Sequence, residues 1–147
     1  MLKYLFLSLL TSLTIVSCRS VPMASLEQDR EAKTFQTSPD MAKIYIYRNE
    51  FLGNQIKVDV TLNGKMVGRT MGKTYLVLKV PAGQHSIMSE AENKSTLDIK
   101  VEKGKNYFVW QESKFGFWLA RTQLHSVPDS EGREGVNECK MIQQVSE

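Results

Sequence analysis

Cysteine and histidine are scarce in this sequence, which has two of each among 147 residues. Neither histidine has a second ligand at helical or zinc-knuckle spacing, and no H-E-x-x-H pattern occurs. His85 shares one face of an expected strand with Ile87, so we expect it to be a hydrogen-bonded strand histidine. The sequence predicts no metal site and no cofactor.

A strong charge of one sign is missing as well. The net charge of +3 is too weak a field to indicate nucleic acid as a partner. Carboxylate pairs such as Glu90 and Glu92 lie among basic residues, and we expect them to be solvated. The hydrophobic share of 41% and the charged share of 24% are typical of a globular protein, and the length indicates one domain.

A complete phosphate-binding loop is also missing. The stretch "GRTMGKT", Gly68 to Thr74, has three residues between its glycines, whereas a P-loop needs four. A P-loop also opens a helix, whereas this stretch leads into the strand-like "TYLVLKV". We therefore expect a turn between strands and no nucleotide site.

No apolar run is long enough to cross a membrane. The longest follows Lys3 and is shorter than the ~20 residues that a spanning helix needs. Between Leu5 and Val16 the polar side chains are all uncharged hydroxyls, so an amphipathic helix would lack a solvated face. A basic residue, an apolar core and small residues are the layout of a secretory signal, and residues 1–17 are predicted to be a cleaved signal peptide.

The four residues Ile15 to Cys18 resemble the lipobox of bacterial lipoproteins, in which an aliphatic, a permissive and a tiny residue precede a cysteine. In that family the cysteine sulfur is acylated, which implies a membrane anchor at Cys18. Arg19 stands where an aspartate would retain such a protein at the inner membrane, so the resemblance implies the outer membrane. The alternative is an ordinary signal peptide with an incidental cysteine.

Acylation of Cys18 would leave Cys139 without a disulfide partner in an oxidising compartment. We expect Cys139 to be a small buried apolar residue. An intermolecular bridge stays open as an alternative, as does a reactive thiol that works with His125 in a hydrolase.

From Lys43 onward, alternation with a period of two predicts strands. In "IKVDVTL", residues 56–62, every second residue is apolar. Asn63-Gly64 then predicts a two-residue type I′ turn, with Val60 facing Val67. Seven or eight such segments, with no strand–helix–strand alternation, predict an all-β fold, an antiparallel β-sandwich or barrel.

A short helix is expected before the first strand, begun by a capping box of Ser25 and Gln28. The predicted parts of the chain are a signal peptide, a tether with this helix, the β-domain and a C-terminal tail, at residues 1–17, 18–40, 41–127 and 128–147.

Four stretches, "AKIYIYR", "VTLNGKMVGRT", "TYLVLKVPAGQHSI" and "KGKNYFVW", resemble the bacterial lipoprotein family called domain of unknown function 2846. The likeness covers most of residues 20–125. The "NGK…PAGQHSI" portion also resembles PEGA-type sandwich modules. These resemblances imply an anchored β-sandwich and bring no established activity.

Aromatic residues crowd into a dozen positions near the end of the β-domain. Strand alternation puts Phe108 and Trp110 on one face, and Tyr107 and Val109 on the other. We expect both faces to be buried, one by the core and one by the N-terminal helix or the C-terminal tail. The alternative is an exposed patch for a protein, a glycan or a lipid interface, made by Trp110, Phe115, Phe117 and Trp118.

Together these features predict an outer-membrane lipoprotein that performs no catalysis. Its periplasmic sandwich would be a binding or structural module, with the membrane and an envelope protein as partners. An accessory lipoprotein of a secretion or envelope assembly machine is the first alternative, and the Cys139–His125 hydrolase is the second.

Overall fold

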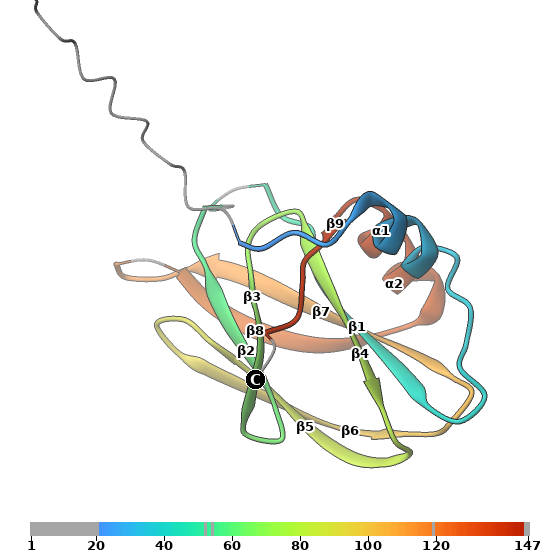
Figure 1. Ribbon diagram of the computed structural model, residues 1–147. Helices are drawn as coiled ribbons and strands as arrows, with labels where there is room; N and C mark the ends of the chain where they lie inside the picture. Colours follow the sequence, from blue (N-terminus) through green and yellow to red (C-terminus); the bar gives the residue numbers. More distant parts are fainter. Residues whose placement is uncertain (1–20, 52, 54, 119, 146–147) are drawn as a thin grey trace, which may run out of the picture.

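The computed structural model describes residues 21–51, 53, 55–118 and 120–145 (Figure 1). The expected signal peptide and Cys18 lie outside the described residues. Within the described part, no helix is long and apolar enough to span a membrane. The elements in chain order are α1 (Leu26–Ala32), β1 (Ala42–Arg48), β2 (Val58–Leu62), β3 (Lys65–Thr70), β4 (Thr74–Val80), β5 (Gly83–Glu90), β6 (Lys94–Val101), β7 (Asn106–Phe115), β8 (Ala120–Val127), α2 (Asp129–Asn137) and β9 (Lys140–Met141).

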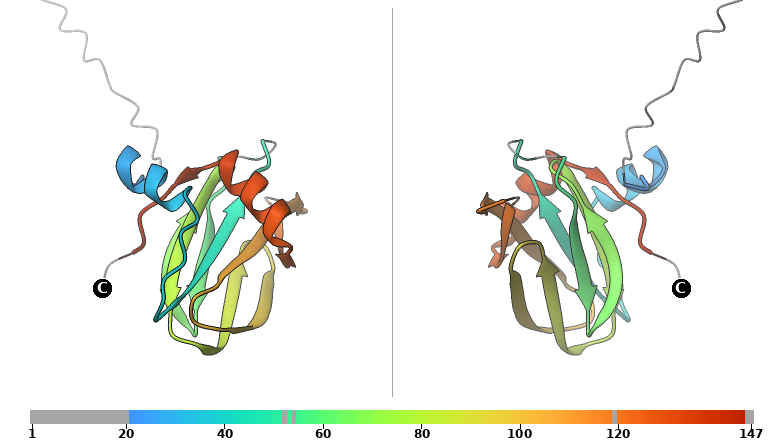
Figure 2. Two further views of the ribbon diagram at one scale, coloured as in Figure 1. Left: turned by 90° about the vertical axis from the view of Figure 1, so that its right-hand side faces the viewer. Right: turned by 90° about the vertical axis from the view of Figure 1, so that its left-hand side faces the viewer.

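The strands form two sheets that pack face to face (Figure 2). The five-stranded sheet has the order β8-β7-β1-β4-β9, and the four-stranded sheet has the order β3-β2-β5-β6. Apolar side chains of both inner faces meet in the core, among them Ile44, Ile46 and Leu76 from the first sheet and Val60 and Ile87 from the second. The predicted all-β sandwich is confirmed, but the described residues form nine strands where seven to eight were predicted, because β9 lies in the segment predicted as a tail.

The prediction that all pairing is antiparallel is wrong for two strand pairs. β1 runs parallel to β7, and β4 runs parallel to β9. Parallel neighbours need a long connection, which is often a helix. Here the chain between β1 and β7 passes through the opposite sheet instead of forming a helix. The sequence therefore contains no strand–helix–strand pattern that would predict this parallel pair.

The β2–β3 hairpin has the predicted turn with a different register. Asn63 and Gly64 have φ of 51° and 81°, the positive values that a type I′ turn requires. Val60 pairs with Gly68 instead of Val67, because a β-bulge shifts the register between Val60 and Thr61. The sequence shows the turn but not the extra residue beyond it.

The segment predicted as a C-terminal tail folds as part of the domain. Helix α2 covers the outer face of the five-stranded sheet, and β9 extends the edge of that sheet (Figure 2). Gly132 and Gly135 allow this close approach, because a Cβ there would overlap the rings of Phe108 and Tyr47. Two glycines disfavour an isolated helix, so this helix depends on its packing.

A second core lies between the five-stranded sheet and the helices. Phe108 belongs to it, whereas Val109 belongs to the core between the sheets, as strand alternation predicts. The rings of Tyr45 and Phe108 stack with their centroids 5.0 Å apart. The buried members of this outer core are Phe35, Tyr45, Tyr47, Tyr75, Val77, Phe108, Val136 and Cys139.

Helix α1 begins with the predicted capping box of Ser25 and Gln28. Asp29 fastens the helix to the sheet, because its Oδ1 accepts hydrogen bonds from the Tyr75 hydroxyl and the Met141 backbone N–H, each at 2.9 Å. Burial raises the pKa of Asp29, but the hydrogen bonds that it accepts lower this pKa overall. The helix is thus tied to both β4 and β9.

The chain just before α1 also packs on the domain. Val21 is only 3% exposed and belongs to the core between the sheets. The Pro22 carbonyl accepts a hydrogen bond from Gln143 N at 2.9 Å, and Ala24 N donates to the Met141 carbonyl at 3.0 Å. The described part of the predicted tether is therefore folded against the C-terminal segment.

A buried polar chain joins the two sheets. The Gln111 side chain accepts a hydrogen bond from the Thr70 hydroxyl and donates one to Ser89, each at 2.6 Å. Ser89 in turn shares a 2.6 Å hydrogen bond with Thr122. All four side chains are buried, so these contacts satisfy groups that would otherwise destabilise the core.

Candidate functional site at the aromatic end

Four large aromatic side chains are exposed at one end of the sandwich. Phe51 in the β1–β2 loop is 71% exposed, and Phe115, Phe117 and Trp118 of the β7–β8 hairpin are 90%, 85% and 84% exposed. We call these four residues the aromatic end, and Figure 1 shows that this loop and this hairpin lie at the same end of the molecule. Clusters of exposed apolar side chains are characteristic of surfaces that bind a protein, a ligand or a membrane.

A cavity of about 400 Å³ opens between the loop and the hairpin. Two members of the aromatic end, Phe51 and Phe115, form part of its wall. The complete lining is Glu50, Phe51, Gly53, Ile56, Ser113, Lys114, Phe115 and Ala120.

Glu92 braces the tip of the hairpin. Its carboxylate accepts hydrogen bonds from the backbone N–H groups of Phe117, at 2.8 Å, and Trp118, at 2.5 Å. Gly116 leaves room for this carboxylate, because a Cβ at that position would overlap it. Glu92 is exposed, as expected, but it also has a bracing role that the sequence does not show, because its partners lie in a hairpin distant in the sequence. The aromatic tip is therefore held in a defined turn.

Arg48 braces the β1–β2 loop from beneath. Its side chain is fully buried, and its guanidinium donates to the carbonyls of Ile56, at 2.6 Å, and Gly53, at 2.9 Å. The same group donates to Ser113 Oγ at 3.2 Å, while Ser113 N donates to Glu50 at 2.8 Å. Burial lowers the pKa of Arg48, and the nearby Glu50 opposes that shift. The loop is thus fixed to strand β7.

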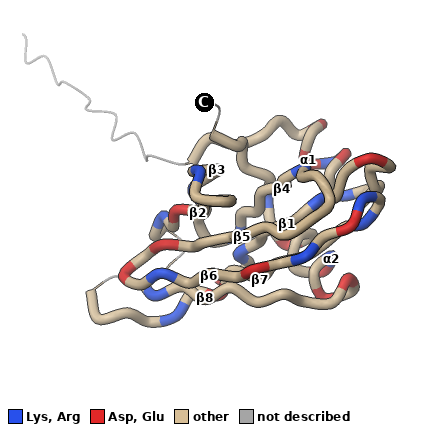
Figure 3. The backbone as a smooth tube through the Cα atoms, turned by 90° about the horizontal axis from the view of Figure 1, so that it is seen from below, with Lys and Arg blue, Asp and Glu red and all other residues tan. Residues whose placement is uncertain are grey.

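Two cations lie directly behind the aromatic tip. Lys114 and Arg121 are direct partners across the β7–β8 pair. Lys114 contacts Gln123 and Glu112, but Arg121 forms no ion pair with the described residues. Like charges in such positions repel each other. Over the described residues, basic and acidic side chains are interspersed (Figure 3).

A family model for a protein of unknown function, DUF2846, matches residues 38–122, more than half of the chain. The chain belongs to the DUF2846 family. The match includes the whole aromatic end and stops before α2. A Haemophilus influenzae protein described as uncharacterized is 36% identical over 133 residues, which cover 88% of this chain and 79% of that protein. No solved structure matches the chain.

In this DUF2846 protein Trp110 does not join the other three aromatic residues predicted for a patch. It is half-buried, and its ring stacks on His125 with the centroids 5.1 Å apart. His125 also forms a 2.8 Å hydrogen bond with Glu112. The predicted patch therefore divides into an exposed group at the tip and one partly covered tryptophan beside α2.

The structure gives Cys139 and His125 of this DUF2846 protein separate partners. Cys139 is 2% exposed, as expected, and its Sγ lies 3.5 Å from the Arg48 carbonyl oxygen. Burial raises the pKa of this thiol to about 12. No hydrogen bond links Cys139 to His125, and a nucleophile needs such a base beside it.

Two smaller predictions are confirmed by the geometry. The "GRTMGKT" stretch consists of the end of β3, a short turn and the start of β4. His85 is buried, and its ring nitrogens form hydrogen bonds with Asn63, at 3.0 Å, and the Pro81 carbonyl, at 2.8 Å. The first stretch therefore connects two strands, and His85 has hydrogen-bond partners within the domain.

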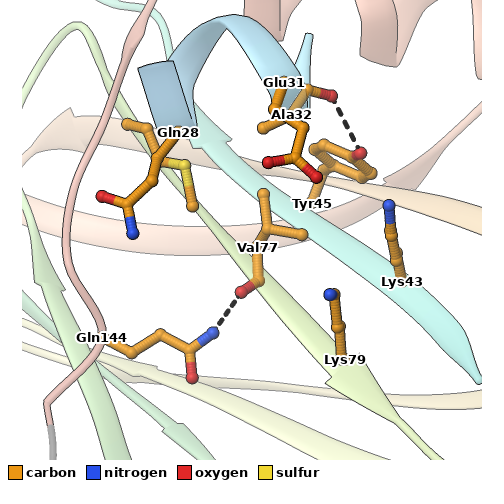
Figure 4. A pocket seen from close by; sticks show the side chains of 9 residues that line it. Gln28, Glu31, Ala32, Lys43, Tyr45, Val77, Lys79 and Gln144 are labelled. Atoms are coloured by element: carbon orange, nitrogen blue, oxygen red, sulfur yellow. Dashed lines mark hydrogen bonds between the residues drawn. The ribbon is translucent and has the colours of Figure 1, made fainter. Parts of the chain in front are cut away.

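A second cavity, of about 380 Å³, lies on the outer face between α1, the five-stranded sheet and the C-terminal segment (Figure 4). Lys43 and Lys79 are partners across β1 and β4 at its side. Burial and the neighbouring Lys79 both lower the pKa of Lys43. The Tyr45 hydroxyl donates to the Ala32 carbonyl at 3.0 Å and so closes the cavity toward α1.

Proposed function

We propose that this protein is a bacterial outer-membrane lipoprotein, anchored through acylated Cys18, whose sandwich is a non-catalytic binding or structural module of the envelope. The observation that carries the proposal is the apolar segment after Lys3, which ends in the lipobox-like Ile15 to Cys18. The relative in Haemophilus influenzae is also bacterial, which is consistent with this kind of anchor.

Acylation of Cys18 explains how the protein could stay bound to the membrane permanently although its apolar segment is short and is cleaved. Each buried methylene contributes about 0.8 kcal/mol, and a single chain gives only marginal binding. A diacylglyceryl cysteine with a further amide-linked chain buries enough methylenes for stable anchoring. The cleaved apolar segment itself is then not needed in the membrane.

Metabolic labelling with palmitate tests the proposal, because the chain supplies its own matched control. We expect label in the wild-type protein and in Cys139→Ser, and no label in Cys18→Ser. We also expect the labelled protein in the outer-membrane fraction. Label that persists in Cys18→Ser, or wild-type protein without label, would contradict the anchor.

A role as an accessory lipoprotein of an envelope assembly machine is the second candidate. The cavity beside α1 favours it, because Lys43, Lys79 and Glu31 offer polar contacts to a partner on a face away from the aromatic end. A photo-crosslinker at Lys79 should then capture a protein in intact cells, whereas one at the exposed Gln84 should not. Equal capture at both positions would count against this role.

A further inference from the structure

The link between the proposed anchor and the folded domain is very short. Arg19 and Ser20 alone separate Cys18 from Val21, which is buried in the core. Three residue steps span at most about 11 Å when fully extended. If Cys18 carries the anchor, as the proposed function holds, the link is too short to separate the domain from the membrane, and the domain must contact the membrane surface.

Contacts with the C-terminal segment keep residues 22–24 from detaching and lengthening this link. Pro22 and Ala24 are hydrogen-bonded to the C-terminal segment at 2.9 and 3.0 Å, and Met23 bridges to Ile142. Detaching them would break these contacts and expose Val21 to water. The side of the domain where the described chain begins must therefore face the bilayer.

Strand pairing places the aromatic end on that same side. Residues 22–24 pair with β9 and the two residues that follow it, and β9 pairs with the first residues of β4, Thr74 and Tyr75. Thr74 lies opposite Arg48, the last residue of β1, so the β1–β2 loop leaves the sheet here. β7 runs parallel to β1, so the β7–β8 hairpin projects in the same direction, as Figure 1 shows.

We propose that the aromatic end inserts into the interface of the phospholipid bilayer to which the anchor holds the protein. Phe51, Phe115, Phe117 and Trp118 would then lie at the boundary between headgroups and acyl chains, where aromatic side chains are favoured. Lys114 and Arg121, one step behind the tip, meet the lipid phosphates there, and these anions relieve the repulsion between the two cations.

The geometry of the tip fits an inserting element. Glu92 satisfies the backbone N–H groups of Phe117 and Trp118, so these groups need no water when the tip leaves it. Arg48 holds the β1–β2 loop in the same way from within the domain. The aromatic rings are thus presented on turns in which the N–H groups of Phe117 and Trp118 and the carbonyls of Gly53 and Ile56 already have partners.

Two single-tryptophan variants of the full-length acylated protein test the inference. Trp110→Phe leaves Trp118 as the reporter, and Trp118→Phe leaves Trp110 as the matched control. Both are reconstituted into vesicles of phosphatidylethanolamine and phosphatidylglycerol, with and without brominated acyl chains. Flotation of the vesicles first establishes that each variant is anchored.

We expect brominated lipid to reduce Trp118 emission at least twofold and the vesicles to shield Trp118 from iodide, while Trp110 emission does not change with bromination. A floating protein whose Trp118 ignores brominated lipid overturns the inference and leaves the anchor intact. Shielding from iodide without quenching by brominated lipid overturns it too, because a protein contact then covers the tip. A protein that carries no acyl group and does not float overturns the proposed function together with the inference.

Discussion

Arg48 and Cys139 show how single residues in this fold take their character from burial. Arg48 is a fully buried cation whose partners are mostly backbone carbonyls of one loop. Removing a partner from a buried charge is more destabilising than breaking an exposed ion pair. Cys139 is held as a neutral thiol by the same effect.

Replacing the guanidinium of Arg48 should loosen the β1–β2 loop. The ammonium group of Arg48→Lys cannot reproduce the planar guanidinium that donates to both the Ile56 and the Gly53 carbonyls. We therefore expect the free energy of unfolding to fall by about 1.5–3 kcal/mol. Arg69→Lys is the matched control, because Arg69 is exposed and pairs with Asp59, and we expect a loss below about 1 kcal/mol. Denaturant titration measures both, and equal losses would contradict the bracing role of Arg48.

Cys139 should resist alkylation in the folded protein. A pKa of about 12 leaves only roughly one thiol in ten thousand ionised at pH 8, and burial excludes the reagent as well. We expect modification by iodoacetamide to be at least 100-fold faster in denaturant than in buffer. Fast alkylation of Cys139 in the native protein would instead support the alternative in which this thiol is the nucleophile of a hydrolase.

Single residues were predictable from the sequence where strand alternation governs them. The alternation of Phe108 and Val109 between two cores follows from the period of two. The burial of Arg48 does not, because a charged residue at a strand end is usually solvated, and its acceptors are backbone atoms of a loop whose conformation the period of two does not predict. Glu92 escapes prediction for the same reason.

The elements of the fold differ in how far they depend on tertiary contacts. The β2–β3 hairpin carries its own turn signal in Asn63-Gly64, and α1 carries its own capping box. Helix α2 has no such signal: its cap forms no side-chain hydrogen bond, and its sequence contains two glycines. The parallel pairing of β1 with β7 likewise arises only when two distant segments meet.

Helix α2 should be sensitive to a substitution that would stabilise an ordinary helix. Gly135→Ala adds a Cβ that overlaps the Tyr47 ring, so we expect the free energy of unfolding to fall by about 1–3 kcal/mol. Ser130→Ala lies on the exposed side of the same helix, and we expect a change within about 0.5 kcal/mol. Thermal unfolding of both variants measures the difference, and a stabilised Gly135→Ala protein would show that α2 does not pack this closely.

The β7–β8 hairpin should lose its fixed turn when Glu92 is removed. Glu92→Ala frees the N–H groups of Phe117 and Trp118, so we expect their hydrogen exchange to speed up roughly tenfold. Glu90→Ala removes an exposed carboxylate two residues away that pairs with Lys94, and it should leave both amides unchanged. Exchange that is fast already in the wild-type protein would show that the tip is not braced.

The described part of the molecule is a sandwich in which residues 21–24 and the segment that follows α2 meet at one edge. The fold class follows from the many short alternating segments and their turns. The closing of the edge by residues 21–24 and β9 could not be read from the sequence, because it joins two segments more than a hundred residues apart. If Cys18 carries the proposed anchor, this closure makes the link to it short and orients the aromatic end toward the membrane.

The mass of the N-terminal peptide of the protein extracted from membranes tests the account most directly. We predict a peptide that begins at Cys18 and carries a diacylglyceryl group on its sulfur and an acyl group on its amine. Digestion after Arg19 would release this modified residue in a very short, lipid-soluble fragment. A peptide that still contains Leu5 to Ser17, or one with a free Cys18 thiol, would contradict the anchor and with it the seating of the aromatic end on the membrane.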